Sequence, residues 1–428
     1  MADTTTTREF DLVVYGATGF TGLRTCQYLA RNYKQGLRWA IAGRSIQKLE
    51  EVREKLVAIE PSLSTLPIIK ADASSAESLQ AMTARTKVVI STVGPFIHHG
   101  EPLVDACIKE GTHYVDSTGE SPFVNNIIKK YHTEARNKNV IIVPQCGFDS
   151  VPSEIGTKMV VDHLRKEYGL PTKSAKLSVV KLRGAVSGGT LASVCAVIEA
   201  RQGSSQAMMD QNQLVPENVA AKIAPAKISM PTVFYDHDVK RWQTYFFMSS
   251  ANEKIVKRSH GLALEADGVG YGPNFTYGET MSAPGFFSAL FASLGMGIGA
   301  AALMVGPLRR FIQRNFLPAP GSGPSDEDIA KGHFTIKVVG ESELPENVSG
   351  DEAPKPIRVV AVVPGGEPGY DETCRYLAEC ALCIIKDEHR VRSENKITGG
   401  VLTPAHTFGQ VLIDRLRAQK VNLTVSKL

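Results

Sequence analysis

The chain has 428 residues, 43% of them hydrophobic and 21% charged, and a formal net charge of +4. This length exceeds what one compact core usually holds and predicts two or three structural units. The small net charge, without a Lys/Arg cluster interleaved with aromatics, argues against a nucleic-acid partner. The N-terminus MADTTTTREF lacks the apolar core of a secretory signal, and seven scattered cysteines indicate reduced thiols rather than disulfides.

Segments typical of strands and helices alternate through residues 1–152, which predicts a doubly wound parallel α/β sheet. The expected strands are apolar runs at 10–16, 37–43, 66–72, 87–95, 112–120 and 140–147. The expected helices between them cover 17–33, 45–60, 75–86, 100–111 and 124–139. Short links between these elements favour a Rossmann domain, which binds ligands at the carboxyl ends of its strands.

The pattern changes over residues 153–370, where strand-like runs follow one another without regular helices. These runs are 176–184, 243–252, 333–342 and 356–366. They predict a second domain of mixed α+β structure. Two segments rich in Pro, Gly, Ser and acidic residues, 317–328 and 341–356, are interpreted as loops.

Residues 371–428 are mainly helical in pattern, and we expect them to pack back on the first domain and complete it. Cys380 and Cys383 form the one local cysteine pair and lie within a predicted helix. We interpret them as buried core thiols, because a metal or redox site needs further ligands that the chain does not place nearby.

A glycine motif lies between the first predicted strand and the first predicted helix. Its residues are Gly16, Ala17, Thr18, Gly19, Phe20, Thr21 and Gly22. In this order Gly16 permits a tight turn, Gly19 the approach of a pyrophosphate, and Gly22 close packing of helix on sheet. The phosphates would bind N–H groups at the positive end of the helix dipole. The alternative is a plain strand–helix turn, but the surrounding elements favour a dinucleotide site.

The end of the second predicted strand indicates which dinucleotide binds. An NAD site usually has an acidic residue there for the ribose 2′-OH, whereas this chain has Arg44 and Ser45, followed by Lys48. A guanidinium can bind a 2′-phosphate and stack on adenine, which predicts NADP(H). The alternative is two exposed cations at a helix start. Further contacts, to adenine and to the nicotinamide ribose, are expected from Asp72, Ala73, Val93 and Gly94.

No tyrosine is followed by lysine four residues later, so the Tyr-x-x-x-Lys proton donor of short-chain dehydrogenases is not predicted. Polar residues after the fourth, fifth and sixth strands are therefore the candidate proton donors or acceptors. They are His98, His99, Asp116, Glu120, Asp149 and Ser150. Each could equally be a helix cap or a loop hydrogen bond. The segment 187–190, Ser-Gly-Gly-Thr, is a candidate for a substrate carboxylate or phosphate, or a simple turn.

The motifs together resemble the saccharopine dehydrogenase-like oxidoreductase family, which includes the mycobacterial trans-acting enoyl reductases of glycolipid synthesis. The segments that carry the resemblance are GATGFTG, AGRSIQKL, VGPFIHHGEPLVDACIKEGTHYVDSTGE, GFDSVPSEIG, SGGTLAS and GGVLTPA. The resemblance spans nearly the whole chain. It implies a Rossmann domain completed by C-terminal elements, an inserted mixed domain and a homodimer. For the bacterial members it implies NADPH-dependent reduction of a carbon–carbon double bond in a lipid intermediate, with no catalytic set matching residue by residue.

Residues 284–308 carry no charge, and Arg309, Arg310 and Arg314 follow. The length would suffice for a membrane span, but a span would separate two halves that are expected to share one fold. A buried helical hairpin is one alternative. The other is an anchor at a membrane or lipid-droplet surface through 284–314.

The last three residues, Ser426, Lys427 and Leu428, match the peroxisomal import address. They predict recognition by the peroxisomal import receptor and a peroxisomal location, with cytosol, lipid droplet or membrane surface as alternatives.

The leading functional prediction is an NADPH-dependent oxidoreductase that reduces a lipid or acyl-type substrate. One alternative is a non-catalytic, cofactor-sensing Rossmann protein on a lipid surface, which the missing proton-donor motif favours. Another is an amino-acid dehydrogenase of the saccharopine type, which would need a cationic site for a dicarboxylate. No cluster of arginines for such a site is evident in the sequence.

Overall fold

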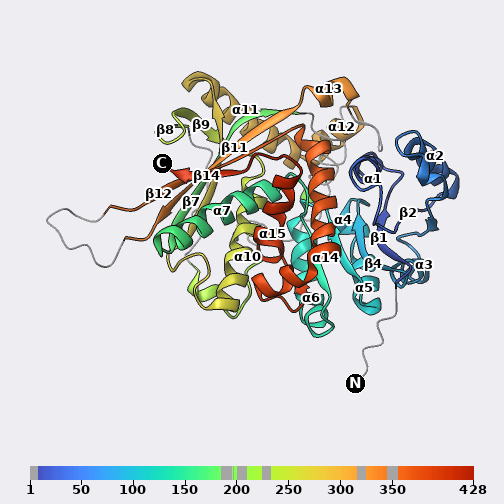
Figure 1. Cartoon of the computed structure of the whole chain (residues 1–428). Coiled ribbons are helices and arrows are strands. Elements are labelled where there is room, and N and C mark those ends of the chain that lie inside the picture. Colours follow the sequence, from blue (N-terminus) through green and yellow to red (C-terminus); the bar gives the residue numbers. More distant parts are fainter. Residues whose placement is uncertain are drawn as a thin grey trace.

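The computed structural model describes residues 8–184, 195, 197–199, 210–223, 233–315, 324–344 and 355–428. The candidate segment 187–190 lies outside the described residues. Two seven-stranded sheets organise the described chain, and helices cover and separate them (Figure 1).

The first sheet is parallel throughout and has the strand order β13-β6-β5-β4-β1-β2-β3. Its strands are β1 (Phe10–Tyr15), β2 (Trp39–Gly43), β3 (Ile68–Lys70), β4 (Thr86–Ser91), β5 (His113–Asp116), β6 (Ile141–Val143) and β13 (Gly400–Val401). The connecting helices are α1 (Phe20–Asn32), α2 (Ile46–Val57), η1 (Pro61–Thr65), α3 (Ala76–Thr83), α4 (Phe96–His99), α5 (Glu101–Glu110) and α6 (Ser121–Asn137). The predicted doubly wound parallel sheet is confirmed.

Strand β1 lies in the centre of this parallel sheet, between β2 and β4. All six of its residues are buried, because helices cover both faces of a parallel sheet and leave neither face to water. Val13 pairs with Ala40 of β2 on one side and with Val89 of β4 on the other. The strand order reverses between β1 and β4, and such a switch point opens a crevice at the carboxyl ends of the strands.

The second sheet is mixed, with the order β14-β12-β11-β7-β10-β9-β8. Strands β7 and β10 run parallel, and the other neighbours run antiparallel. Its strands are β7 (Thr172–Arg183), β8 (Phe234–Asp236), β9 (Arg241–Tyr245), β10 (Thr276–Ala283), β11 (His333–Ser342), β12 (Arg358–Gly365) and β14 (Thr424–Lys427). The predicted mixed second sheet is confirmed.

A layer of helices lies between the two sheets (Figure 1). It comprises α7 (Val151–Tyr168), α10 (Ser249–Asp267), α14 (Thr373–Asn395) and α15 (Pro404–Ala418). Helix α14 packs on β1, β4 and β5 of the first sheet, while α7 packs on β7, β11 and β12 of the second. Outside this layer lie η2 (Ala220–Lys222), α11 (Phe286–Met304), α12 (Gly306–Asn315), α13 (Asp326–Ala330) and η3 (Pro368–Glu372).

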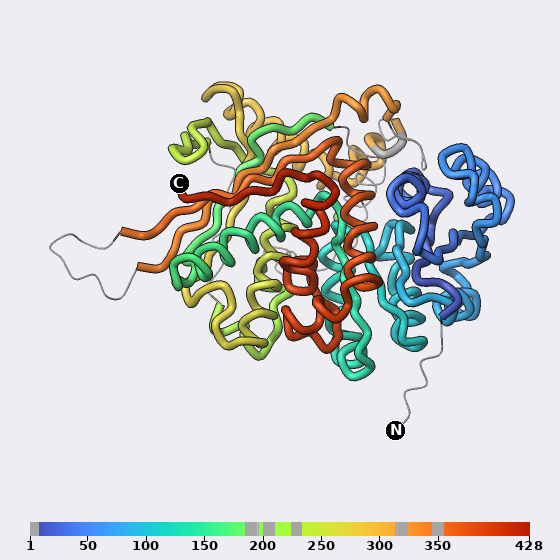
Figure 2. Tube along the Cα trace, in the orientation of Figure 1, coloured from blue at the N-terminus to red at the C-terminus, as the bar shows by residue number. Residues whose placement is uncertain are grey.

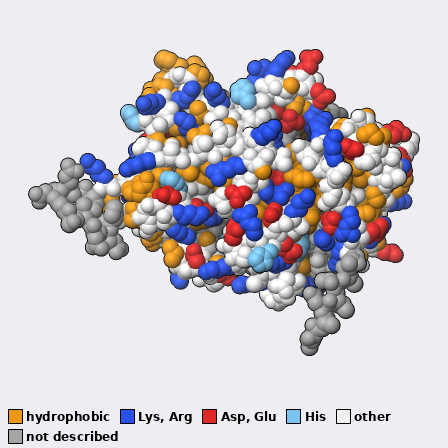
Figure 3. Space-filling model, viewed as in Figure 1, with side chains coloured by type: hydrophobic (Ala, Val, Ile, Leu, Met, Phe, Trp, Pro, Cys, Tyr) orange, Lys and Arg blue, Asp and Glu red, His pale blue; other side chains and the backbone are white. Residues whose placement is uncertain are grey.

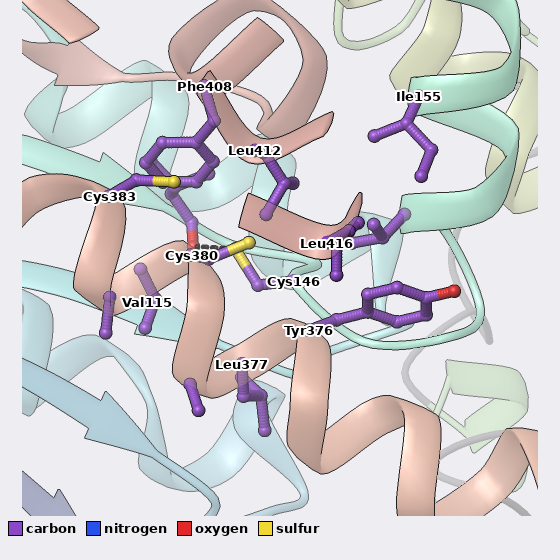
Figure 4. Close-up of a cluster of buried hydrophobic side chains, with 14 of the residues drawn as sticks. Val115, Cys146, Ile155, Tyr376, Leu377, Cys380, Cys383, Phe408, Leu412 and Leu416 are labelled. Carbon is purple, nitrogen blue, oxygen red and sulfur yellow. Dashed lines mark hydrogen bonds between the residues drawn. The ribbon is translucent and has the colours of Figure 1, made fainter. Parts of the chain in front are cut away.

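The main core fills the space between α14, α15, α7 and the first sheet (Figure 4). Cys383 lies beside Phe408 in this core, and Cys146 lies next to Cys380 (Figure 4). All three thiols are buried, and burial raises their pKa. Such thiols stay protonated at neutral pH and act as small apolar side chains.

The C-terminal residues divide between the two sheets. Strand β13 extends the first sheet beside β6, as expected for elements that complete the first domain. Strand β14 instead pairs with β12 at the edge of the second sheet, and Figure 2 shows this last segment running beside β12. Ser426 pairs with Val360 and Lys427 with Val359, so two residues of the predicted import address form a strand. The address itself stays a prediction.

Candidate cofactor and active site

The glycine motif forms the turn between β1 and α1 at the switch point of the first sheet. Gly16 has φ of 90°, a backbone conformation that favours glycine, and a Cβ there would lie 2.7 Å from Thr92 Oγ1. A Cβ on Gly22 would lie 2.1 Å from the carbonyl oxygen of Gly16. On Gly19 a Cβ would meet only that same oxygen, at 3.3 Å, so the space in front of Gly19 is open.

The first turn of α1 offers the amides that a phosphate needs. Gly19 is the N-cap in an extended conformation, and no side chain caps the helix there. The first helical hydrogen bond runs from Leu23 N to Gly19 O at 2.9 Å. The amides of the preceding turn therefore have no partner within the helix, and together with the helix dipole they suit an anion. These observations fit the diphosphate of a dinucleotide.

The cations predicted to select the dinucleotide lie at the carboxyl end of β2. Arg44 and Lys48 are exposed, and Ser45 caps α2 by accepting from Lys48 N at 3.3 Å. Asp72, after β3, accepts from Ser74 N and Ser74 Oγ. These bonds and the nearby charge of Arg44 lower the pKa of Asp72. The ends of β2 and β3 thus lie near enough for the charge of Arg44 to act on Asp72, and the adenosine site stays a prediction.

The loop after β4 lies against the glycine turn. Thr92 N donates to Tyr15 O at 3.0 Å, and Thr92 Oγ1 lies 3.1 Å from the same oxygen. Val93 is half-buried and Gly94 is exposed, and the Gly94–Pro95 peptide bond is cis. This loop borders the space in front of the glycine turn, and the sequence predicts that the nicotinamide ribose binds there.

Phe20 takes a role that the motif did not predict. Its ring forms a T-shaped pair with Tyr370 of η3, with centroids 4.5 Å apart, and the Arg24 guanidinium lies over the Phe20 ring at 5.0 Å. Arg24 also forms an ion pair with Asp371 at 3.3 Å. Phe20 therefore ties the start of α1 to the segment that enters α14.

Asp116 and Glu120, two of the candidate catalytic residues, are fully buried and hold backbone in place. Asp116 accepts from Tyr114 Oη at 2.7 Å and from the amides of Thr118 and Gln145. Burial raises its pKa to about 7. Glu120 accepts from Phe96 N at 3.0 Å and from Ile97 N at 2.7 Å, so it caps α4. Both carboxylates join loops at the ends of neighbouring strands.

Asp149 differs from these two because it is partly exposed to solvent. It is half-buried, and burial alone raises its pKa to about 6. Within the described parts of the chain no hydrogen bond to this carboxylate is formed. A Cβ on Gly119 would lie 3.8 Å from both Asp149 Oδ2 and Met248 Cε. Asp149 therefore lies between the end of β5 and the second domain, on the carboxyl side of the first sheet.

His98 and His99 are exposed at the end of α4, with ring centroids 6.2 Å apart. Ser150 turns away from solvent and donates to Asn252 Oδ1 at 3.2 Å. Of the candidates within the described residues, Asp149 is thus the one that combines an unbonded carboxylate with a place at the strand ends.

A buried polar chain beside Asp149 was missed by sequence reasoning. Asn252 Nδ2 donates to Glu279 Oε2 at 3.0 Å, and Tyr277 Oη donates to Glu279 Oε1 at 2.7 Å. Burial raises the pKa of Glu279 to about 7. The chain connects α10 to β10 and, through Ser150, to the first sheet. No motif marks these residues, because they come together only when the two sheets pack.

A Rossmann sheet with a glycine turn at its switch point has the architecture of a dinucleotide-binding protein. Residues 12–143 match the model of the saccharopine dehydrogenase NADP binding domain. The chain is 35% identical to a putative trans-acting enoyl reductase of Mycobacterium tuberculosis over 99% of both chains. It is 33% identical to the trans-acting enoyl reductase of Mycobacterium ulcerans over 98% of this chain and 99% of that protein.

The fold also matches saccharopine dehydrogenase (L-Glu forming) of Saccharomyces cerevisiae. The TM-score is 0.54 at 13% identity, over 98% of this chain and 100% of that one. With full-length relatives above 30% identity, the chain belongs to the saccharopine dehydrogenase-like oxidoreductase family, as the motifs indicated.

Proposed function

We propose that the protein uses NADPH, in preference to NADH, to reduce the carbon–carbon double bond of an enoyl group in an acyl or lipid substrate. The observation that carries this proposal is the full-length relationship to proteins named trans-acting enoyl reductases. The preference for NADPH is supported by Arg44 and Lys48 at the end of β2, where a carboxylate would favour NADH.

The reaction needs a hydride and a proton. Bound NADPH would supply the hydride to one carbon of the double bond. Asp149 is the proposed donor of the proton to the other carbon, and it would regain a proton from solvent. A pKa of about 6 keeps part of the Asp149 population protonated near neutral pH, which is the property that a general acid requires. Asp116 is not proposed for this step, because its carboxylate is already bonded to Tyr114 and to backbone amides.

The experiment is NADPH oxidation with an enoyl thioester, in the wild-type protein and in Asp149→Asn. We expect kcat to fall by a factor of about 100 or more, while NADPH binding is unchanged, because the amide cannot donate an acidic proton. Asp105→Asn is the matched control, since Asp105 lies in an exposed ion pair with Lys109 on α5.

Two outcomes would count against the proposal. Full activity of Asp149→Asn would remove Asp149 from the reaction and leave the reductase assignment standing. A wild-type protein that binds NADPH but oxidises none with enoyl or keto acyl thioesters would reject the reductase assignment and favour a cofactor-sensing role.

A further inference from the structure

Helix α11 is apolar and almost uncovered. Its Phe287, Phe291 and Ile298 side chains are 70%, 69% and 71% exposed. Within the described chain α11 is the one helix long and apolar enough to cross a membrane; its mean hydropathy is 1.8, and 6% of its most apolar stretch is buried. Further exposed apolar residues on α11, α12 and the link between them are Phe286, Leu294, Met304, Val305, Leu308 and Phe311. A contiguous apolar surface of this kind marks an interaction site.

An aromatic ladder forms the base of this surface. The ring of Phe286 lies 5.1 Å from Trp242, and Trp242 lies 5.6 Å from Tyr235, both on the β8–β9 hairpin. Tyr235 is 41% exposed and Trp242 is half-buried. Tryptophan and tyrosine are the side chains that favour the boundary between hydrocarbon and water.

Exposed cations border the apolar surface, and the acidic side chains of the β8–β9 hairpin, Asp236 and Asp238, are paired with Lys176. Residues 284–315 contain no aspartate or glutamate. Arg310 is exposed on α12, and Lys240 and Arg241 are exposed at the β8–β9 turn beside the aromatic ladder. Figure 3 shows hydrophobic side chains capping the upper left of the molecule, with Lys and Arg side chains around the base of this cap. Such a border complements anionic phospholipid head groups.

The connections of α11 exclude a simple span. Strand β10 leads into α11 and β11 follows α13, and both strands belong to the second sheet. Helix α12 has ten residues, about 15 Å in length, which is about half of the hydrocarbon thickness. Arg309 holds α12 in place through Leu303 O at 3.1 Å and Glu199 at 3.2 Å. The chain therefore enters and leaves on the same side.

We propose that α11 and α12 dock on a membrane surface that carries anionic phospholipids, with the apolar side chains of α11 in one leaflet and the cations at the head groups. The proposal does not depend on the reductase reaction, because its surface includes no residue of the cofactor site. The membrane would thus cover the apolar side chains of α11 that the fold leaves exposed.

The test is flotation of the full-length protein with phosphatidylcholine vesicles, with and without phosphatidylserine. We expect the wild-type protein to float with the vesicles, and more strongly when phosphatidylserine is present. For the variant Phe287→Ser/Phe291→Ser/Ile298→Ser, the partition coefficient into the vesicles should fall by a factor of about ten or more. Because these three side chains are mostly exposed, the variant should keep its melting temperature and its NADPH affinity.

The control is Val269→Ser, which removes a 49% exposed apolar side chain from the loop after α10, and it should float like the wild type. Equal flotation of the triple variant would overturn the proposal, as would a wild-type protein that binds neither type of vesicle. A dimer that the triple variant abolishes, without vesicle binding, would also overturn it and assign the surface to a second copy of the chain. None of these outcomes tests turnover, so failure here is distinct from failure of the reductase assignment.

Discussion

Asp116 and Asp149 follow neighbouring strands of the parallel sheet and have opposite surroundings. The Asp116 carboxylate accepts hydrogen bonds from Tyr114 Oη and from two backbone amides, and it thereby fixes the loops after β5 and β6. Asp149 has no such partners, and its pKa is raised to about 6 by burial alone. A carboxyl group with a raised pKa and no hydrogen-bond partner, such as Asp149, is suited to proton transfer. A carboxyl group with a raised pKa that is fully hydrogen-bonded, such as Asp116, stabilises the structure.

The glycine turn yields a prediction at the same scale. In Gly22→Ala the new Cβ would overlap the carbonyl of Gly16, which belongs to rigid backbone. We expect an unfolding free energy lower by about 1–3 kcal/mol and an NADPH affinity lower by a factor of about ten or more, measured by urea titration and fluorescence. Gly278→Ala is the control, because nothing lies within 4 Å of a Cβ there. Unchanged NADPH binding in Gly22→Ala would show that the turn does not hold the phosphates.

Among single residues, the sequence predicted the glycine turn between β1 and α1 but could not rank the catalytic candidates. Local order was enough for the glycine turn, because strand, turn and helix are adjacent in the chain. The difference between Asp116 and Asp149 depends on the hydrogen bonds that Asp116 accepts from Tyr114 Oη on its own strand and from the amide of Gln145, which follows the neighbouring strand β6. No spacing in the chain encodes those contacts.

At the element scale, Glu154 joins three helices. It lies on α7, accepts from Ser259 Oγ of α10 at 2.6 and 2.9 Å, and accepts from Ala405 N of α15 at 2.9 Å. Burial raises its pKa from 4.5 to about 7. The charged form is therefore less stable in the folded protein than in the unfolded chain.

This shift predicts how stability changes with pH. The folded protein favours protonated Glu154, so its contribution is fully present below pH 4.5 and is lost as the pH rises towards 7. In Glu154→Gln that loss is absent, and the fall in unfolding free energy between pH 4.5 and 8 should shrink by about 3 kcal/mol. Urea titrations at both pH values measure it. Glu134→Gln, an exposed partner of Lys138, should behave like the wild type, and an identical pH slope in both variants would contradict the account.

For the uncharged run 284–308, the sequence left two alternatives open. An uncharged run such as 284–308 is compatible with a buried hairpin or with an exposed helix, because apolarity alone does not say what covers it. The structure leaves α11 exposed, since the strands before and after it belong to one sheet and no element packs over its outer surface among the described residues. Strand β14 was missed because its four residues carry no apolar alternation.

At the scale of the whole molecule, the N-terminal and C-terminal parts are joined through Glu379 of α14. This buried carboxylate accepts from Tyr28 and Tyr33 of the first domain, at 2.7 and 2.5 Å, and from Arg415 Nε of α15 at 2.8 Å. The contacts join α14 and α15 to α1 and the residue that follows it. These bonds link the end of α1 to a residue more than 340 positions further along the chain.

Removing this carboxylate should destabilise the whole fold. In Glu379→Ala the largely buried Arg415 loses a main partner, and we expect the unfolding free energy to fall by about 3–5 kcal/mol. Glu394→Ala breaks an exposed pair with Arg390 and should cost less than about 1 kcal/mol. Urea unfolding compares the two. A loss in Glu379→Ala no larger than in Glu394→Ala would show that the link does not hold the two parts together.

The choice between NADPH and NADH is measured by titrating the purified protein with both cofactors. We expect NADPH to bind at least about tenfold more tightly. Arg44→Ala should lose most of that preference, while Lys55→Ala, at the end of α2, should keep it. Equal or tighter binding of NADH by the wild-type protein, or an unchanged NADPH affinity in Arg44→Ala, would show that Arg44 does not select the 2′-phosphate.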